Sequence, residues 1–380
     1  IKGKGNRSNL VSVGPFGSLA PGEQVKVSFA IVCAATVDDG QPAYLDTKDQ
    51  RGDFIANAIS CQNSFNGEDK NFNGKLDEGE EIAAKKNGKL DRWIFPEPPV
   101  IPKTKVVAKE NEIDVYWTDN AVVTPDPSTR ELDFEGFRIY KTQVGFDVQT
   151  EQDLNKDLKL VASYDVKANG KFFDNGFDSV RLAQPVVFEG DTNRYQYKYS
   201  FKNVLSGWQH AVSITAFDKG NDTLKILSQE SSKLDNIKRV FPGKPANSSL
   251  KTSAPFVYPN PYYGVSAWDG FKTSYEEDKR LVFSNLPVKC NIKIYTYSGD
   301  LVDEINHDMS YNGGDLGNGN NQRGWYNNYA PGTERVFSGG EHAWDLLSKN
   351  SQLIARGLYI FSVEDLATGQ THPGKFVVIK

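Results

Sequence analysis

Residues 112–117 read Glu112-Ile-Asp-Val-Tyr-Trp117 and give the clearest indication of the fold. They mix β-branched and aromatic residues in a short run, as β-strands do. Trp117, and Tyr140 further along, are large enough to anchor a core. Similar runs recur through residues 100–246, at Lys105–Ala108, Gly136–Lys141, Lys159–Asp165, Arg194–Phe201 and Gln209–Phe217. Short strands separated by turns predict an immunoglobulin-like β-sandwich in this part of the chain.

The composition of the whole chain agrees with this prediction. The chain has 380 residues, of which 38% are hydrophobic and 12% aromatic, with 33 glycines, 18 prolines and one methionine. Such a mixture favours strands and turns over helices. The length is enough for roughly two to four domains. We therefore expect an all-β protein built from tandem β-sandwiches.

Charge and hydropathy exclude two classes of partner. The formal net charge is −5, and no long basic run is present, so we expect no nucleic acid partner. No stretch approaches the roughly 20 apolar residues of a membrane helix, so we expect no membrane span. The chain starts at Ile1 without a signal peptide, which is the pattern of a mature or internal fragment of a longer precursor.

An acidic segment at residues 61–95 carries a metal-binding pattern. The sequence Asp69-Lys-Asn-Phe-Asn-Gly-Lys-Leu-Asp-Glu-Gly-Glu80 places oxygen ligands at positions 1, 3, 5, 9 and 12 of a calcium loop and glycine at position 6. The predicted calcium ligands are Asp69, Asn71, Asn73, the backbone carbonyl of Lys75, Asp77 and Glu80. The alternative is an acidic turn rich in Asn and Gly that binds nothing.

A second, partial copy of this pattern follows. Asn87-Gly-Lys-Leu-Asp91 repeats Asn73-Gly-Lys-Leu-Asp77, but residues 83–86 lack oxygen ligands. Asn87, Lys89 and Asp91 are thus either part of a second calcium site or, for Asp91, a group that closes the first. A bound metal would stiffen this segment, because its binding free energy becomes folding free energy. With the proline-rich Pro96–Pro99, residues 61–99 form a calcium-binding linker.

Residues 247–380 predict a second sandwich. Phe241–Ser253 is expected to be a linker into it, and a loop without obvious structure spans residues 311–340. Trp325, Tyr326 and Tyr329 in that loop are candidates for contact with a glycan or a partner; the alternative is a loop that folds back on its own domain. The expected strands lie within Val257–Pro261, Arg280–Pro287, Cys290–Tyr295, Gly299–Ile305, His342–Asp345, Ala355–Val363 and Gly374–Lys380.

Both sandwiches resemble known families. Glu112–Trp117, Phe134–Tyr140 and His210–Asp218 resemble fibronectin type III modules of secreted bacterial surface proteins. Residues 257–380, from Tyr-Pro-Asn-Pro to the final Gly-Lys-Phe, resemble C-terminal sorting domains of type IX secretion cargo and are similar to the immunoglobulin-like domain of flagellar hook-capping proteins. The acidic loop resembles an EF-hand or dockerin loop. These resemblances imply export and contact with the outer-membrane secretion and anchoring machinery.

Residues 1–60 are expected to be the end of an upstream β domain with a short helix. Val25, Val27, Phe29 and Ile31 alternate as in a half-buried strand, and residues 46–60 suit a helix. Cys33 and Cys61 lie in the same region and are a candidate disulfide pair; the alternative is that each is a small buried apolar residue.

No catalytic motif is evident, so we expect no enzyme activity. The chain has four histidines, and none lies in a known metalloprotease, nucleotide-binding or hydrolase pattern. The neighbouring carboxylates Asp133 and Glu135 are expected to be solvated charge.

The sequence therefore predicts an extracellular or cell-surface structural or adhesive region that is stabilised by calcium and has a sorting domain. Copies of itself or surface glycans are further expected partners. Two alternatives stay open: the accessory tail of a secreted protease or glycosidase, and a carbohydrate-binding module.

Overall fold

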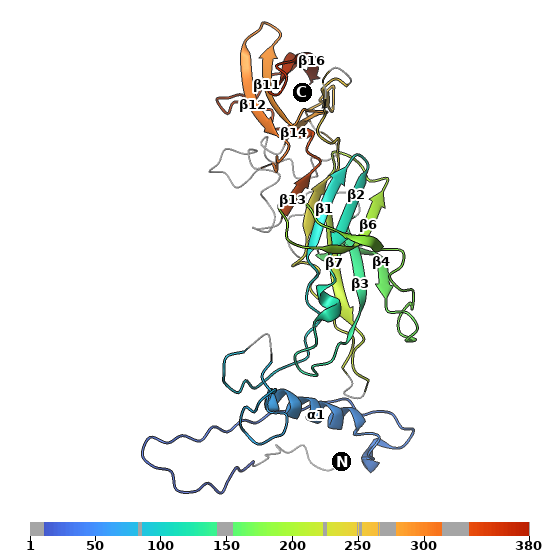
Figure 1. Ribbon diagram of the computed structural model, residues 1–380, viewed down its shortest axis with the longest axis vertical. Helices are drawn as coiled ribbons and strands as arrows, with labels where there is room; N and C mark the ends of the chain where they lie inside the picture. Colours follow the sequence, from blue (N-terminus) through green and yellow to red (C-terminus); the bar gives the residue numbers. More distant parts are fainter. Residues whose placement is uncertain are drawn as a thin grey trace. The chain divides into compact units, whose positions relative to one another are not determined.

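The computed structural model describes residues 11–82, 86–142, 155–222, 226–248, 250, 253–264, 266, 279–313 and 334–379 (Figure 1). The chain divides into two compact units, and each is described here by itself. The first comprises residues 1–95 with 221–226, and the second comprises residues 96–220 with 227–380. The boundary at Phe95 and Pro96 falls in the predicted linker.

The first unit is organised by one long helix, α1 (Gly52–Asn66), which follows a short 3-10 turn, η1 (Ala43–Leu45). Asp53 in its first turn suits the positive end of the helix dipole. The helix ends at Gly67, whose φ of 59° is left-handed and whose N–H donates to the carbonyl of Asn63 at 3.0 Å. The predicted helix over residues 46–60 is therefore present but lies several residues further along.

The strand predicted at Val25–Ile31 is absent. Residues 11–42 form neither helix nor strand, and Phe29 and Ile31 are 81% and 87% exposed. A strand needs a neighbour for its backbone groups and a core for its apolar side chains. The described part of the first unit supplies neither, so the alternating pattern does not become a strand.

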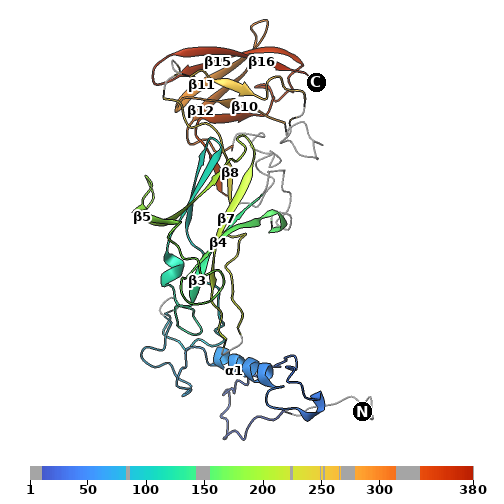
Figure 2. The ribbon, with the colours of Figure 1, turned by 90° about the vertical axis from the view of Figure 1, so that its right-hand side faces the viewer.

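The second unit begins with the first sandwich (Figure 2). One sheet has the order β1-β2-β6-β5, and the facing sheet has the order β13-β8-β7-β3-β4. A short 3-10 turn, η3 (Asn120–Val123), follows β2. The strands are β1 (Thr104–Lys109), β2 (Glu112–Trp117), β3 (Phe134–Lys141), β4 (Lys159–Asp165), β5 (Arg181–Val186), β6 (Tyr195–Lys202), β7 (His210–Asp218), β8 (Lys238–Phe241) and β13 (Glu334–Phe337).

Trp117 is the centre of this sandwich, as the sequence predicts. It is fully buried, stacks on Tyr197 with ring centroids 5.6 Å apart, and meets Phe137 of the facing sheet edge-on at 5.7 Å. Ile113 and Ile214, also fully buried, pack in the same cluster. Because the cluster takes side chains from both sheets, it holds the two layers face to face.

The second sandwich packs the sheet β14-β10-β9 on the sheet β12-β11-β15-β16. Phe283, Phe361 and Phe376 meet in its core. Gly374 is required there, because a Cβ at this position would lie 2.1 Å from the Phe361 ring. The strands are β9 (Phe256–Tyr258), β10 (Leu281–Ser284), β11 (Lys289–Thr296), β12 (Leu301–Asp308), β14 (Glu341–Trp344), β15 (Gly357–Asp365) and β16 (Thr371–Val378).

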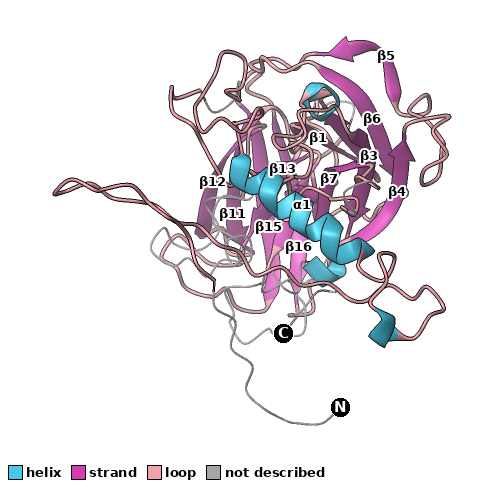
Figure 3. Ribbon diagram, turned by 90° about the horizontal axis from the view of Figure 1, so that it is seen from below, coloured by secondary structure: helices cyan, strands magenta, loops and turns pink. Residues whose placement is uncertain are grey.

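The all-β prediction is confirmed, since strands far outnumber helices in the described chain (Figure 3). Each strand predicted after residue 100 is present within a few residues of its expected bounds. Strands β5 and β8 were not predicted. Strand β13 corrects a prediction, because it lies inside the stretch expected to be an unstructured loop. No helix among the described residues is long and apolar enough to cross a membrane.

Candidate metal site

The predicted calcium loop begins where helix α1 ends. Gly67 turns the chain, and Glu68 and Asp69, both buried, follow directly. The N–H of Asp69 still donates to the carbonyl of Asn66 at 3.1 Å. The first predicted ligand is thus fixed at the rigid end of a helix.

Asp69 folds the loop around its own carboxylate. Its Oδ1 accepts the N–H of Asn73 at 3.0 Å, and its Oδ2 accepts the N–H of Gly74 at 2.9 Å. Gly74 has a φ of 80°, a left-handed value that glycine adopts without strain. This is the turn that position 6 of a calcium loop requires.

The two asparagines join Asp69 to Asp77. The Oδ1 of Asn71 accepts the N–H of Asn73 at 3.0 Å, and the Oδ1 of Asn73 accepts the N–H of Lys75 at 2.8 Å. Both Nδ2 groups donate to Oδ2 of Asp77, each at 2.6 Å. The side chains at positions 3, 5 and 9 therefore converge on one point.

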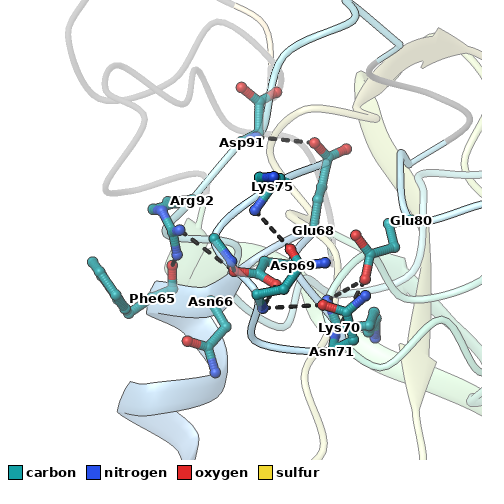
Figure 4. A network of polar contacts seen from close by, with 12 residues as sticks. Phe65, Asn66, Glu68, Asp69, Lys70, Asn71, Lys75, Glu80, Asp91 and Arg92 are labelled. Atoms are coloured by element: carbon teal, nitrogen blue, oxygen red, sulfur yellow. Dashed lines mark hydrogen bonds and ion pairs between the residues drawn. The ribbon is translucent and has the colours of Figure 1, made fainter. Parts of the chain in front are cut away.

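Glu80 closes the loop (Figure 4). It is buried, and its Oε1 accepts the N–H groups of Lys70 at 2.9 Å and Asn71 at 3.2 Å. Its Oε2 accepts the N–H of Asp77 at 2.9 Å. One carboxylate thereby ties the end of the loop to its beginning.

The loop carries oxygen groups of the kind that calcium prefers, but two of its amides would have to turn to offer them. Among the described residues, no three His, Cys, Asp or Glu side chains gather closely enough to hold a metal by themselves. The loop would supply amide and carbonyl oxygens as well, which suit a hard cation. The amides of Asn71 and Asn73 point their NH₂ groups at Asp77, while their oxygens accept the N–H groups of Asn73 and Lys75. Turning an amide so that its oxygen faces an ion beside Asp77 would therefore give up its bond to the backbone.

The partial second copy repeats this arrangement. The Oδ1 of Asn87 accepts the N–H of Lys89 at 2.7 Å, and its Nδ2 donates to Oδ2 of Asp91 at 2.8 Å. Glu81 takes the place that Asp69 has in the first loop, because its Oε1 accepts the N–H groups of Asn87 and Gly88, both at 2.6 Å. The Gly88 and Asn87 N–H groups lower the pKa of Glu81.

Glu68 completes the second copy as Glu80 completes the first. Its side chain is fully buried, with Oε1 accepting the N–H of Ile82 at 2.7 Å and Oε2 accepting the N–H of Asp91 at 2.9 Å. Ile82 follows Glu81 just as Lys70 follows Asp69. Neither Glu68 nor Glu81 was predicted as a site residue, although both directly flank the first loop.

The end of the second copy is fastened to the helix. The carbonyl of Asp91 accepts the N–H of Glu68 at 3.0 Å. Arg92 lies over the Phe65 ring, 4.8 Å from its centroid, and pairs with Asp69 at 3.5 Å. The first loop, the second copy and the end of α1 therefore form one polar cluster.

The other predicted sites have different outcomes. Cys33 and Cys61 are free thiols, so the structure contains no disulfide between them. Cys33 is exposed on an extended segment that α1 holds through a bond from Asn57 to the Cys33 carbonyl, at 2.9 Å. Trp325, Tyr326 and Tyr329 lie outside the described residues.

The carboxylates predicted to be solvated charge, Asp133 and Glu135 at the start of β3, are not simple solvated charge. Glu135 is buried, and burial raises its pKa. Burial, with the nearby charges of Asp126 and Asp218, raises the pKa of Asp133 to about 6. Asp126 and Asp218 each accept backbone N–H groups, which accounts for their burial as a structural feature.

Comparison with known proteins finds only low-scoring similarities to solved structures. No family model matches the chain, and neither does any curated protein. The two-domain fibronectin type III segment of chicken tenascin is 8% identical, with 75% of this chain and 100% of that segment covered and a TM-score of 0.22. The central fibronectin-III array of RIM-binding protein is 11% identical, with coverages of 74% and 69% and a TM-score of 0.19.

A bacterial similarity is also found. PorZ, a surface component of the type IX secretion system of Porphyromonas gingivalis, is 13% identical, with 81% of this chain and 48% of PorZ covered and a TM-score of 0.22. None of these similarities carries an inference about activity. The fold follows from the sheet orders and cores, which make the chain an all-β protein of two sandwiches preceded by a helix and a double polar loop.

Proposed function

We propose that this chain is a non-catalytic, calcium-stabilised structural region of an exported bacterial surface protein. The observation that carries the proposal is the double loop after α1, in which Asp69 with Glu80 and Glu81 with Glu68 occupy matching positions. The carboxylates of this loop already hold the predicted ligands in place before a cation binds. Such a loop is suited to be a connection between domains that becomes rigid when it binds an ion.

Calcium would bind the first loop through Asp69, Asn71, Asn73, Asp77, Glu80 and the Lys75 carbonyl. The ion would supply positive charge among carboxylates that otherwise repel one another. Hydrogen bonds join the end of α1, the first loop and the second copy. The stabilisation that the bound ion provides would therefore extend over the whole cluster.

A second ion would use the second copy. Glu81, Asn87, Asp91 and the Lys89 carbonyl would provide its oxygens, and Glu68 would close it. The backbone hydrogen bonds of the second copy match those of the first loop. Glu81 takes the place of Asp69 and Glu68 that of Glu80, and this match supports a second site.

Calorimetric titration and thermal unfolding of the full chain test the first ion. Saturating calcium, at about 100 times its dissociation constant, should stabilise the first unit by about 2.7 kcal/mol. The double variant Asp69→Ala with Glu80→Ala should lose the part of the binding heat and of the thermal shift that belongs to the first ion. Glu78→Gln is the matched control, since this exposed loop carboxylate is not a ligand. Absence of binding heat and of any effect of chelator on the wild-type chain would refute the calcium proposal.

The stoichiometry separates one ion from two. The wild-type chain should bind two calcium ions, and Glu81→Ala should bind one. A single ion in the wild-type chain would restrict the proposal to the first loop.

The surface location is proposed from the resemblance of the last sandwich to sorting domains. Residues 96–380 fused behind a reporter should bring it to the surface of a bacterium that has type IX secretion. The same fusion ending before β15 should leave the reporter inside. Equal export of both fusions, or of neither, would contradict a sorting role. The calcium measurements would be unaffected by that result.

A further inference from the structure

One strand from the sequence of the second sandwich pairs with a sheet of the first sandwich. In sequence β13 (Glu334–Phe337) lies between β12 and β14, two strands of the second sandwich. In space it pairs in parallel with β8 at the edge of a first-sandwich sheet, with Glu334 opposite Lys238 and Phe337 opposite Phe241. The side chains of Lys238 and Glu334 form an ion pair at 2.8 Å.

Apolar packing reinforces this pairing. The rings of Phe241 and Phe337 stack with centroids 4.5 Å apart and an angle of 8°. Val282 of β10 and Ala343 of β14, both buried, belong to the same cluster, with Tyr258 packed against it. The cluster thus contains side chains from both sandwiches.

A buried carboxylate lies beside that cluster. Glu341 accepts the hydroxyl protons of Tyr258 and Ser284, both at 2.9 Å, and the N–H of Lys244 at 3.3 Å. A Cβ on Gly243 would lie 2.1 Å from Glu341. The backbone at Gly243 therefore lies directly against the Glu341 carboxylate, with no room for a side chain.

Further hydrogen bonds and an ion pair join the two sandwiches. Arg280, which is buried, donates to the carbonyl of Gly207 at 3.2 Å. The Lys244 side chain pairs with Glu110 at 2.9 Å, and its carbonyl accepts the N–H of Gly340 at 3.1 Å. The predicted linker at Phe241–Ser253 is thus hydrogen-bonded along part of its length.

We propose that β13 is a latch that makes the two sandwiches one cooperative unit. Sandwiches joined by a free linker open independently, since few contacts cross between them. Here the sheet edge at β8 is completed by a strand from the other sandwich, which also covers an edge that would otherwise be open to other chains. The inference is independent of calcium and of export.

Hydrogen exchange of the full chain tests the latch, with peptides from β7 reporting on the first sandwich and peptides from β15 on the second. Phe337→Ala should speed exchange in both by similar factors, roughly tenfold or more, because it removes a large side chain from the shared cluster. Tyr297→Ala is the control, since Tyr297 is 74% exposed and far from the cluster in sequence. Faster exchange in only one sandwich would overturn the proposal.

A second variant keeps the test decisive if Phe337→Ala fails to fold. Lys238→Cys with Glu334→Cys places two thiols directly opposite each other in the parallel register. Oxidation to the disulfide should slow exchange in β7 and β15 together relative to the reduced form. Slowing confined to one sandwich, or no slowing, would show that β13 does not couple them.

Discussion

The carboxylate of Glu68 accepts the backbone N–H of Asp91 at 2.9 Å, so the residue before the first loop holds the end of the second. Glu80 makes the equivalent bond to Asp77 within the first loop. A carboxylate therefore closes the first loop and another closes the second copy. The one that closes the second copy, Glu68, lies before the first loop in the sequence. The two copies are expected to fold together.

Glu68→Gln should destabilise the first unit. Glutamine retains one acceptor oxygen, so the N–H of either Ile82 or Asp91 loses its buried partner, at a cost of about 1–3 kcal/mol. Exchange of the α1 amides measures the effect. Glu78→Gln removes the same charge at an exposed position and should change little. Equal behaviour of the two variants would contradict the closing role of Glu68.

Gly67→Ala should be more harmful than Gly88→Ala. Both glycines have positive φ values, 59° and 71°, so an alanine at either position would be strained. Only at Gly67 would the new Cβ meet another group, the Asp91 carbonyl oxygen at 2.3 Å; at Gly88 nothing lies within 4 Å. We expect about 1 kcal/mol for Gly88→Ala and clearly more for Gly67→Ala. Denaturant unfolding followed at α1 would show whether the order is reversed.

Asp133→Asn should stabilise the first sandwich at neutral pH. The pKa of Asp133 is raised to about 6 in the folded chain, so the folded state favours the protonated form. Its ionisation therefore destabilises folding increasingly as pH rises from about 4 to above 6. We expect a gain of about 1 kcal/mol at pH 7, discounted for partial solvation, and none below pH 4. Urea unfolding across this range gives the result, with Asp178→Asn as an exposed control; a gain that persists at pH 4 would exclude this origin.

Asp114 should show the opposite dependence. Burial raises its pKa, but bonds from Lys109, Ser200 and Lys198 outweigh it and bring the pKa to about 2. Because the folded value lies below the unfolded one, its contribution is present above pH 4 and is lost as pH falls toward 2. Asp114→Asn should cost on the order of 1–2 kcal/mol at pH 7, reduced because both lysines are partly exposed. The difference between variant and wild type should narrow steadily between pH 4 and pH 2.5 in urea titrations; a constant difference would rule out the ionised carboxylate as its cause.

Local patterns were sufficient for much of the fold. β2 and β4 have the bounds that the sequence predicts, because their composition and their flanking turns specify a strand without reference to distant residues. Trp117 was predicted as a core anchor for the same reason. The calcium ligands expected between Asp69 and Glu80 stay a prediction, although the structure joins these side chains by hydrogen bonds.

Other features depend on partners that are remote in sequence. Val25–Ile31 has a strand pattern but no strand, since nothing in the described chain pairs with it. β13 lies inside the stretch expected to be a loop, and it is a strand because it pairs with β8, which is remote in sequence. Glu68 serves the second loop only because the chain returns to the helix end at Asp91.

Local sequence was enough to predict the strand-rich class, the positions of the long strands and the oxygen-ligand spacing of the first loop, because these follow from nearest-neighbour sterics and residue periodicity. Only the folded chain shows that Glu68 and Glu81 complete the second copy and that β13 joins the two sandwiches. Both are hydrogen-bonded pairings between distant segments, and their free energy appears only when the folded chain brings donor and acceptor together.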